Sequence, residues 1–259
     1  MISWTIWFPL YGHALGLTHL PTLPYHHALG GLGPLIAAFL TTWIYQKQQG
    51  VKLLIKKCFQ VRPIIYLLIA LFSPFLIALV AATINYFVDN SPINLSGLLT
   101  STEFLQFNLL TYFIYNLLFF GFGEEVGWRG FALPRLQKKF NALTSSVILT
   151  LFWAVWHIPL FFYKPGFTSM DIAGIFGWTF SLLTGSILLT WHYNSSRSSI
   201  LVCAVFHSTV NMAFTADFGD NNYVNYMGFL ITVWAILTII VFKPKKLATY
   251  ERANNTDSY

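Results

Sequence analysis

Long apolar runs separated by short polar segments make up most of this chain. The runs have about 17 to 25 residues, which is the length that a helix needs to cross a hydrocarbon layer about 30 Å thick. Since backbone groups in such a layer must be hydrogen-bonded internally, each run is expected to be an α-helix. The pattern therefore predicts an all-α bundle of about seven to eight membrane spans. The runs are residues 29–46, 64–88, 104–123, 143–163, 171–192, 199–215 and 223–242.

Two further segments have apolar character without the length or uniformity of a full span. Residues 2–17 form an apolar stretch without the basic start and small-residue cleavage site of a signal peptide, so we interpret it as a short first span. Residues 47–62 place apolar side chains on one helical face and lysines around the rest of the turn, which predicts an amphipathic helix in the inner membrane interface. The apolar face consists of Val51, Leu54, Ile55, Cys58 and Phe59.

The run that begins at residue 171 carries a small residue at every fourth position. Such a stripe lets two membrane helices approach closely, so it predicts a packing contact and not a catalytic site. The stripe consists of Ala173, Gly177, Ser181 and Gly185.

The composition agrees with a membrane protein and excludes several soluble classes. Apolar residues make up 56% of the 259 residues and charged residues 9%, and the mean hydropathy is +0.60. An ordinary soluble domain is about one quarter charged, so this chain cannot cover itself as a soluble enzyme would. Its two cysteines, Cys58 and Cys203, indicate no disulfide framework. It also lacks a Gly-rich phosphate loop, a His-Glu-x-x-His motif and a Cys-x-x-Cys motif.

The net charge of +6 is explained by the orientation of the chain in the membrane. When the predicted spans alternate across the bilayer, all of the 15 Lys and Arg residues except Lys164 fall on the same side. Basic residues are enriched in cytoplasmic loops, so this side, which includes the C-terminus, is expected to be cytoplasmic. The expected partner is thus the lipid bilayer and not a nucleic acid. The expected organisation is one membrane domain over residues 1–250 and a flexible cytoplasmic tail over 251–259.

Ionisable side chains at or inside a span are rare and costly, which makes them candidates for function. Glu124 and Glu125 follow the third run, and on a helix they point about 100° apart, so they cannot face one target. Arg129 comes four residues after Glu125, a spacing that favours an ion pair. Glu124 is then the unpaired carboxylate and is available as a base. The alternative is an interfacial charge cluster that simply ends the helix.

Two further motifs place polar side chains in apolar helices. His157 comes one turn after Trp153, and Pro159 weakens the helical hydrogen bonding just there. His207 and Asn211 are four residues apart and project from one face. Each motif has a simpler interpretation, since a single histidine can be a core hydrogen-bonding group and a polar pair can join two helices.

Together these side chains, from three helices, form a set that can activate water against a peptide bond. A carboxylate and one imidazole can deprotonate the water, while the other imidazole and the carboxamide donate to the developing oxyanion. The alternative is a zinc site made by His157, His207 and Glu124. Since Asn211 is a good amide donor and a poor zinc ligand, we expect a mechanism in which no metal or other cofactor is required.

In order and spacing the motifs resemble the CPBP family, which comprises CAAX proteases and bacteriocin-processing enzymes and includes type 2 CAAX prenyl endopeptidases and Abi-like proteins. The resemblance covers roughly residues 100–215 and rests on Glu-Glu-x-x-x-Arg at 124–129, aromatic-x-x-x-His at 153–157 and His-x-x-x-Asn at 207–211. The chain departs from the family where Trp153 replaces the usual Phe and where the N-terminal span is short.

The resemblance implies an intramembrane endopeptidase with about eight transmembrane helices around a cavity open to the cytosolic side. Such an enzyme cleaves a membrane-tethered peptide or protein near its C-terminus, as in CAAX or leader-peptide processing, and the family is commonly called a metalloprotease. The membrane would be the cell membrane in a bacterium and the endoplasmic reticulum elsewhere. A second interpretation, of another class, is a non-catalytic membrane scaffold or bacteriocin-immunity protein with the same fold.

The resemblance also implies a role for each matching side chain. It implies that Glu124 is the general base and Glu125 its supporting carboxylate. It implies that His157 shares in activating the water, and that His207 and Asn211 hold the oxyanion. The residues expected to support this site structurally are Arg129 and Trp153.

Overall fold

The structure is a computed structural model that describes residues 1–17, 20–101, 104–218 and 222–249. Within these residues it consists of helices and loops, and the strand-like pairing is limited to an isolated antiparallel bridge between Ser101 and Ala216. The prediction of an all-α, polytopic membrane protein is confirmed. The predicted flexible tail at 251–259 lies outside the described residues. Helices long and apolar enough to cross a membrane are His26–Cys58, Ile64–Asp89, Ala142–Phe162, Ile172–Ser195 and Asn222–Lys246.

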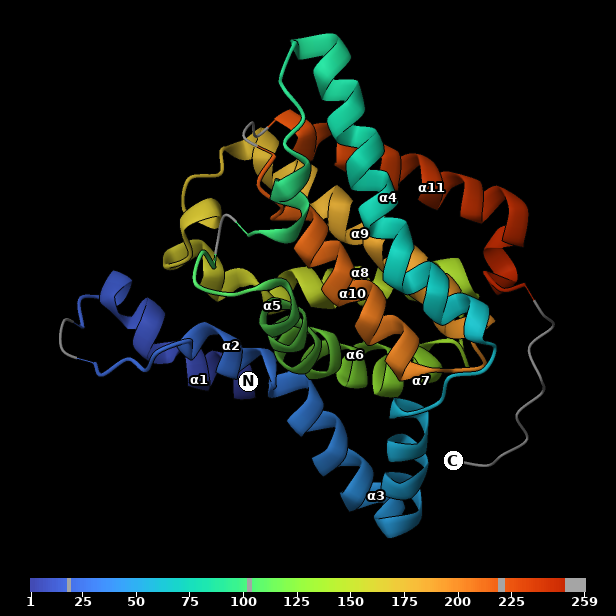
Figure 1. The fold of residues 1–259 in the computed structure, drawn as a ribbon. Helices are drawn as coiled ribbons and strands as arrows, with labels where there is room; N and C mark the ends of the chain where they lie inside the picture. The colour runs from blue at the N-terminus through green and yellow to red at the C-terminus, as the bar shows by residue number, and fades with distance from the viewer. Residues whose placement is uncertain (18–19, 102–103, 219–221, 250–259) are drawn as a thin grey trace.

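The helices form a bundle in which α10 is central (Figure 1). It packs beside α4 along much of its length and also contacts α5 and α9, while α11 packs against α4, α8 and α9. The helices are α1 Ile2–Tyr11, α2 His26–Gly31, α3 Gly33–Cys58, α4 Ile64–Asp89, α5 Leu109–Asn116, α6 Gly123–Glu125, α7 Leu133–Leu136, α8 Ala142–Trp156, α9 Ile172–Ser195, α10 Ile200–Phe214 and α11 Asn222–Lys246.

Polar side chains cap the N-terminal ends of four helices. The side chains of Asn108, Asn141, Asp171 and Ser199 accept hydrogen bonds from the backbone N–H three residues later, at 2.9, 2.8, 2.7 and 3.2 Å. Each such bond satisfies one of the backbone donors that a helix leaves unpaired at its start. These caps explain why α5, α8, α9 and α10 begin close to the starts of the predicted runs.

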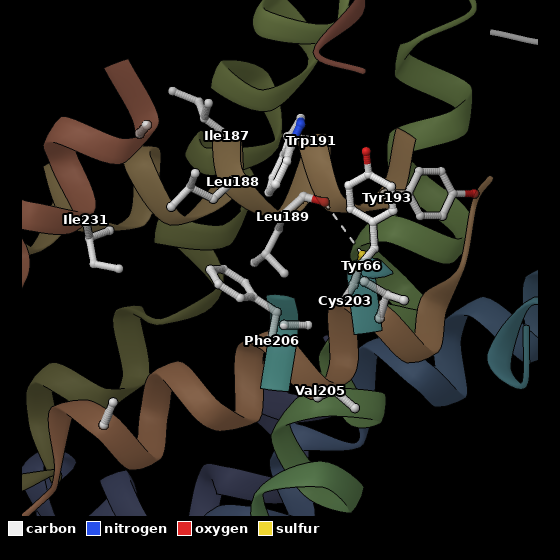
Figure 2. Close-up of a cluster of buried hydrophobic side chains, with 14 of the residues drawn as sticks. Tyr66, Ile187, Leu188, Leu189, Trp191, Tyr193, Cys203, Val205, Phe206 and Ile231 are labelled. Atoms are coloured by element: carbon white, nitrogen blue, oxygen red, sulfur yellow. Dashed lines mark hydrogen bonds between the residues drawn. The ribbon is translucent and has the colours of Figure 1, made fainter. Parts of the chain in front are cut away.

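The main apolar core lies where α9 and α10 meet α4 and α11 (Figure 2). Leu188 of α9 is fully buried and Phe206 of α10 nearly so. Cys203 is also buried there, and its thiol lies 3.6 Å from the carbonyl oxygen of Leu189. Neither Cys203 nor Cys58 is in a disulfide, as expected.

The N-terminal stretch does not form a span. Its helix α1 has 10 residues, which rise about 15 Å, or half of a hydrocarbon layer. The helix ends at Gly12, where the chain continues as a short 3₁₀ turn. The expected single span over 2–17 is therefore wrong. Instead, α1 docks on the bundle through the buried Trp7, whose indole N–H donates to the carbonyl of His27 at 2.7 Å.

Helix α3 consists of two arms, because Lys47 has non-helical backbone angles (φ 55°, ψ −151°). The first arm corresponds to the predicted span 29–46, and the second to the predicted amphipathic helix, which turns back from it (Figure 1). On the second arm Leu54 and Cys58 are buried against the bundle, whereas Ile55 and Phe59 are 43% and 70% exposed. The apolar face is thus only partly covered by the bundle.

The predicted packing contact of the small-residue stripe in α9 is wrong. Ala173, Gly177 and Ser181 are exposed, and a Cβ atom added to Gly177 or Gly185 would meet no neighbouring atom within 4 Å. The physical reason is that no described helix packs on this face of α9. Ser181 and Gly185 instead line the cavity described below.

Candidate active site

The first motif lies midway along a continuous helical segment. This segment includes α5, a π-helical stretch at Leu117–Phe122, α6, a second π-helical stretch at Val126–Ala132, and α7. The alternative in which Glu124 and Glu125 form a charge cluster that ends the helix is therefore wrong, since the helical segment continues to Leu136, beyond the predicted run 104–123. π-Helical turns are rare and are frequent at functional sites.

Glycines allow this segment to approach its neighbours backbone to backbone. A Cβ atom on Gly121 would lie 2.7 Å from the carbonyl oxygen of Ala204 in α10, and one on Gly123 would lie 2.7 Å from the carbonyl oxygen of Gly31 in α2. Such distances are shorter than a side chain tolerates, so only glycine fits at these two positions. The close approach brings the two glutamates of α6 against α10.

Glu125 is sealed inside the protein together with a cation. Its side chain is fully buried, and its Oε1 accepts a hydrogen bond from Arg129 Nη1 at 3.0 Å. The same oxygen lies 2.8 Å from His207 Nδ1. Since an ionised carboxylate can only accept, His207 carries a proton on Nδ1 and donates it to Glu125. Arg129 is also fully buried. It therefore does not lie in a loop, although the count of basic residues placed it among those of the cytoplasmic loops.

Trp153 contacts four polar groups of the site, which are those of Glu124, Arg129, His157 and His207. Its indole N–H donates to Glu124 Oε2 at 2.7 Å, and its backbone carbonyl lies 2.7 Å from His157 Nδ1. The guanidinium carbon of Arg129 is 4.9 Å from the centre of the Trp153 ring. The edge of the His207 ring also meets this ring, at 5.6 Å between centroids. The CPBP family, which the motifs resemble, usually has phenylalanine at this position. Trp153 therefore supplies a hydrogen-bond donor that phenylalanine lacks.

The predicted residues meet at a cavity of about 410 Å³. Glu124, His157, His207 and Asn211 all line it, together with Trp153. Glu124 is the only carboxylate among the described residues of its wall. Glu125 and Arg129 are not part of the wall. The two adjacent glutamates therefore have different surroundings, one facing the cavity and the other lying behind it.

The remaining wall is aromatic near His157. The ring of Phe167 lies parallel to the imidazole with 6.2 Å between centroids, and Trp178 meets it edge-on at 5.4 Å. Both residues also line the cavity. This part of the wall is suited to contact with apolar side chains.

Further polar residues of the wall were not predicted. Asn116 is buried, lines the cavity, and donates from Nδ2 to the carbonyl oxygen of Tyr112 at 3.0 Å. Thr215 also lines it, and its hydroxyl lies 2.8 Å from the Tyr112 hydroxyl. A sequence signal for both exists: Asn116 is eight residues before Glu124, and Thr215 is four residues after Asn211, so both repeat the helical spacing of the motifs.

The donor groups do not form a ready metal site. No group of three His, Cys, Asp or Glu side chains within residues 1–17, 20–101, 104–218 and 222–249 is arranged so that it could hold a metal ion. The alternative zinc site of His157, His207 and Glu124 is thus not arranged as a metal-binding group in this structure. A zinc ion needs about three protein ligands within roughly 2.0–2.2 Å.

Comparison with known proteins identifies relatives of the segment that carries the site. Residues 106–213 match a family model described as type II CAAX prenyl endopeptidase, Rce1-like. Over 93 residues the chain is 32% identical to CAAX prenyl protease 2 of Methanococcus maripaludis, and this match covers 34% of each protein. The chain thus matches about one third of the length of this curated relative. The family match contains all three motifs.

Proposed function

We propose that this chain, whose residues 106–213 match the family model of type II CAAX prenyl endopeptidases, is an intramembrane endopeptidase. In this proposal it cleaves a membrane-tethered peptide with a glutamate-activated water. The observation that carries this proposal is the unequal environment of the two glutamates. Glu124 lines the cavity and accepts only a neutral indole N–H, whereas Glu125 is held behind it by Arg129 and His207.

In the proposed reaction, Glu124 takes a proton from a water molecule in the cavity. His157 shares in this step: its Nδ1 donates to the Trp153 carbonyl, so the neutral ring has its lone pair on Nε2. The water oxygen then bonds to the scissile carbonyl carbon, and the carbonyl oxygen becomes an oxyanion. When the C–N bond breaks, the proton passes to the leaving amine. General base catalysis of this kind contributes about 10²- to 10⁴-fold in rate.

The oxyanion is assigned to His207 and Asn211. Because Nδ1 of His207 already donates to Glu125, this ring can donate to the oxyanion from Nε2 only as an imidazolium. Glu125 balances that charge in the buried site. The carboxamide of Asn211 supplies a neutral donor one helical turn away. Preorganised donors of this type are each worth about 10²- to 10³-fold in turnover.

We propose that no metal is obligatory, since the site residues are engaged with one another and form no metal-ligating group in the described part of the chain. Enzyme treated with a strong chelator is expected to keep most of its activity. Loss of activity that returns with one zinc ion per chain would instead identify a metalloenzyme, with His157, His207 and Glu124 as the first ligands to test.

For the substrate, we propose a membrane-tethered peptide or protein cut near its C-terminus. The name of the Methanococcus maripaludis relative refers to CAAX prenyl substrates. With about one third of that protein matched, a prenylated tail is a proposal for this chain and not a finding. We further propose, as the resemblance implies, that the cavity opens to the cytosolic side.

The test combines a defined substrate with an unbiased search. Purified enzyme in detergent is incubated with a synthetic lipidated peptide ending in a CAAX sequence, and cells carrying the wild type or Glu124→Ala are compared by proteomics of membrane peptides. The proposal expects cleavage products with the wild type and none with Glu124→Ala. Identical membrane peptides in both strains, with no cleavage in vitro, would favour the non-catalytic scaffold or immunity protein.

A further inference from the structure

A second hollow, distinct from the catalytic cavity, lies on the surface of the bundle. This groove has a volume of about 610 Å³ and is lined by residues of α1, α7 and α8 and by neighbouring π-helical residues. All of its lining residues are apolar except Arg135 and Lys139, and none is acidic. Phe152 and Val155, which line it on α8, are 62% and 53% exposed, so the groove faces the surroundings of the bundle.

The two cations lie at one end of the groove. Arg135 is in α7, and Lys139 is in the short turn that leads from α7 to α8. Since α8 runs away from that turn, Val155 and Trp156 in its last turn lie at the other end. The residues of α8 that line the groove extend from Leu149 to Trp156, a rise of about 10 Å. The groove therefore has a cationic end and an apolar path that holds a large part of one acyl chain in a leaflet about 15 Å deep.

Arg135 is held in position at this end. Its Nη1 donates to the backbone carbonyl of Phe131 at 2.7 Å, and its guanidinium carbon lies 3.5 Å from the centre of the Phe131 ring. A guanidinium carries five N–H donors in a planar fork that matches phosphate geometry. By the distribution of basic residues, this end of the groove is on the expected cytoplasmic side, where anionic headgroups collect.

From this charge complementarity we propose that the groove binds an anionic phospholipid, with its phosphate at Arg135 and Lys139 and one acyl chain along α8 towards Trp156. The lipid would also contact Trp156, a residue of the active-site wall. Trp156 lines both the groove and the catalytic cavity, its ring meets the ring of His157 edge-on at 4.7 Å, and its carbonyl accepts from the Trp4 indole at 3.0 Å. A bound acyl chain would thus support the wall that carries His157. Lipid binding is independent of the proposed proteolysis, since it is measured without a substrate.

The test is native mass spectrometry of the purified protein with phosphatidylglycerol or phosphatidylcholine of the same acyl chains. At about 1 kcal/mol per basic residue, two contacts correspond to about 30-fold in affinity. The wild type is expected to bind phosphatidylglycerol about 30-fold more tightly than phosphatidylcholine. The double variant Arg135→Gln/Lys139→Gln should lose this preference. The matched control, Lys52→Gln/Lys56→Gln, removes the same charge from the second arm of α3 and should keep it.

A second variant tests the apolar part of the groove with both cations intact. Val155→Trp fills the groove from an exposed position and should also weaken phosphatidylglycerol binding by about tenfold. The proposal is overturned if the Arg135/Lys139 variant binds phosphatidylglycerol as the wild type does, or if the wild type binds both lipids equally. Unchanged phosphatidylglycerol binding by Val155→Trp would also overturn it. So would a dimer of the chain that binds no lipid, because a second copy would then occupy the groove.

Discussion

Glu124 and Glu125 are neighbours in the chain, yet they belong to two different regions of the molecule. Glu124 faces a cavity lined by aromatic and polar side chains and accepts one indole N–H from Trp153. Glu125 faces the packed interior and accepts from both Arg129 and His207. The difference teaches that the surroundings, and not the residue type, decide which carboxylate faces the cavity and which is held by a cation, and our proposal for the base rests on this difference.

The sealed region also joins three parts of the bundle. Glu125 links α6 to α10 through His207, and Arg129 reaches the face of Trp153 in α8. Removing one partner of such a buried set leaves an uncompensated charge, which costs far more than the pair contributes. The two regions should therefore respond differently to the same chemical change.

The largest effect is expected at the cavity. Glu124→Gln keeps the shape of the side chain and its acceptor for Trp153 but loses the base, so turnover should fall by about 10²- to 10⁴-fold. The thermal midpoint in detergent should remain close to that of the wild type. Turnover of a lipidated peptide per folded molecule checks this expectation, and wild-type turnover would remove Glu124 from the mechanism.

In the sealed region the same change should act on folding. Glu125→Gln leaves Arg129 without a buried counter-charge, which is expected to cost about 3–5 kcal/mol of stability. Chemical unfolding in detergent measures this loss, with Glu124→Gln as the matched control. If both variants lost activity equally and both folded normally, the contrast between the two regions would be wrong.

Asn211 extends the comparison to another residue of the cavity wall, on α10. Asn211→Ala is expected to lower kcat by about 10²- to 10³-fold and to change KM little, because an oxyanion donor acts mainly in the transition state. Asn211→Asp should be worse, since it places negative charge where negative charge develops. Full turnover by Asn211→Asp would reduce Asn211 to a packing contact.

The smallest effect is expected at Trp153, which borders both regions. Trp153→Phe keeps an aromatic ring and the backbone carbonyl for His157 but removes the N–H that holds Glu124, so kcat should fall by about tenfold with KM unchanged. The matched control is Trp191→Phe, which removes an indole N–H that has no partner among the described residues of the core. Equal kcat values in both variants would show that the indole hydrogen bond is irrelevant to turnover.

Much of the fold was predictable because membrane length and helix caps are local properties of the sequence. The spans over 64–88 and 171–192 correspond to α4 and α9 to within a few residues. The ion pair of Glu125 with Arg129 follows from a spacing of four residues. These features need no knowledge of which helices are neighbours.

What could not be predicted depends on partners distant in the sequence. The stripe in α9 has ideal spacing for close packing, but no helix among the described residues covers it. Gly121 and Gly123, at the end of the predicted run 104–123, do pack on backbone, and this contact was not predicted from the sequence. Small residues permit close approach without specifying whether a neighbour is present. The bond from Trp153 to Glu124 was missed for the same reason, since it joins residues 29 positions apart.

The contrast between the two glutamates is tested most directly by chemical rescue. Each is replaced by alanine, and turnover is measured with increasing formate, a carboxylate small enough to enter the cavity that Glu124 lines. Formate should restore turnover to Glu124→Ala in a concentration-dependent manner and leave Glu125→Ala unchanged, because the space behind the wall is sealed. A folded Glu124→Ala that stays inactive at all formate concentrations, or equal rescue of both variants, would contradict the assignment of Glu124 as the base.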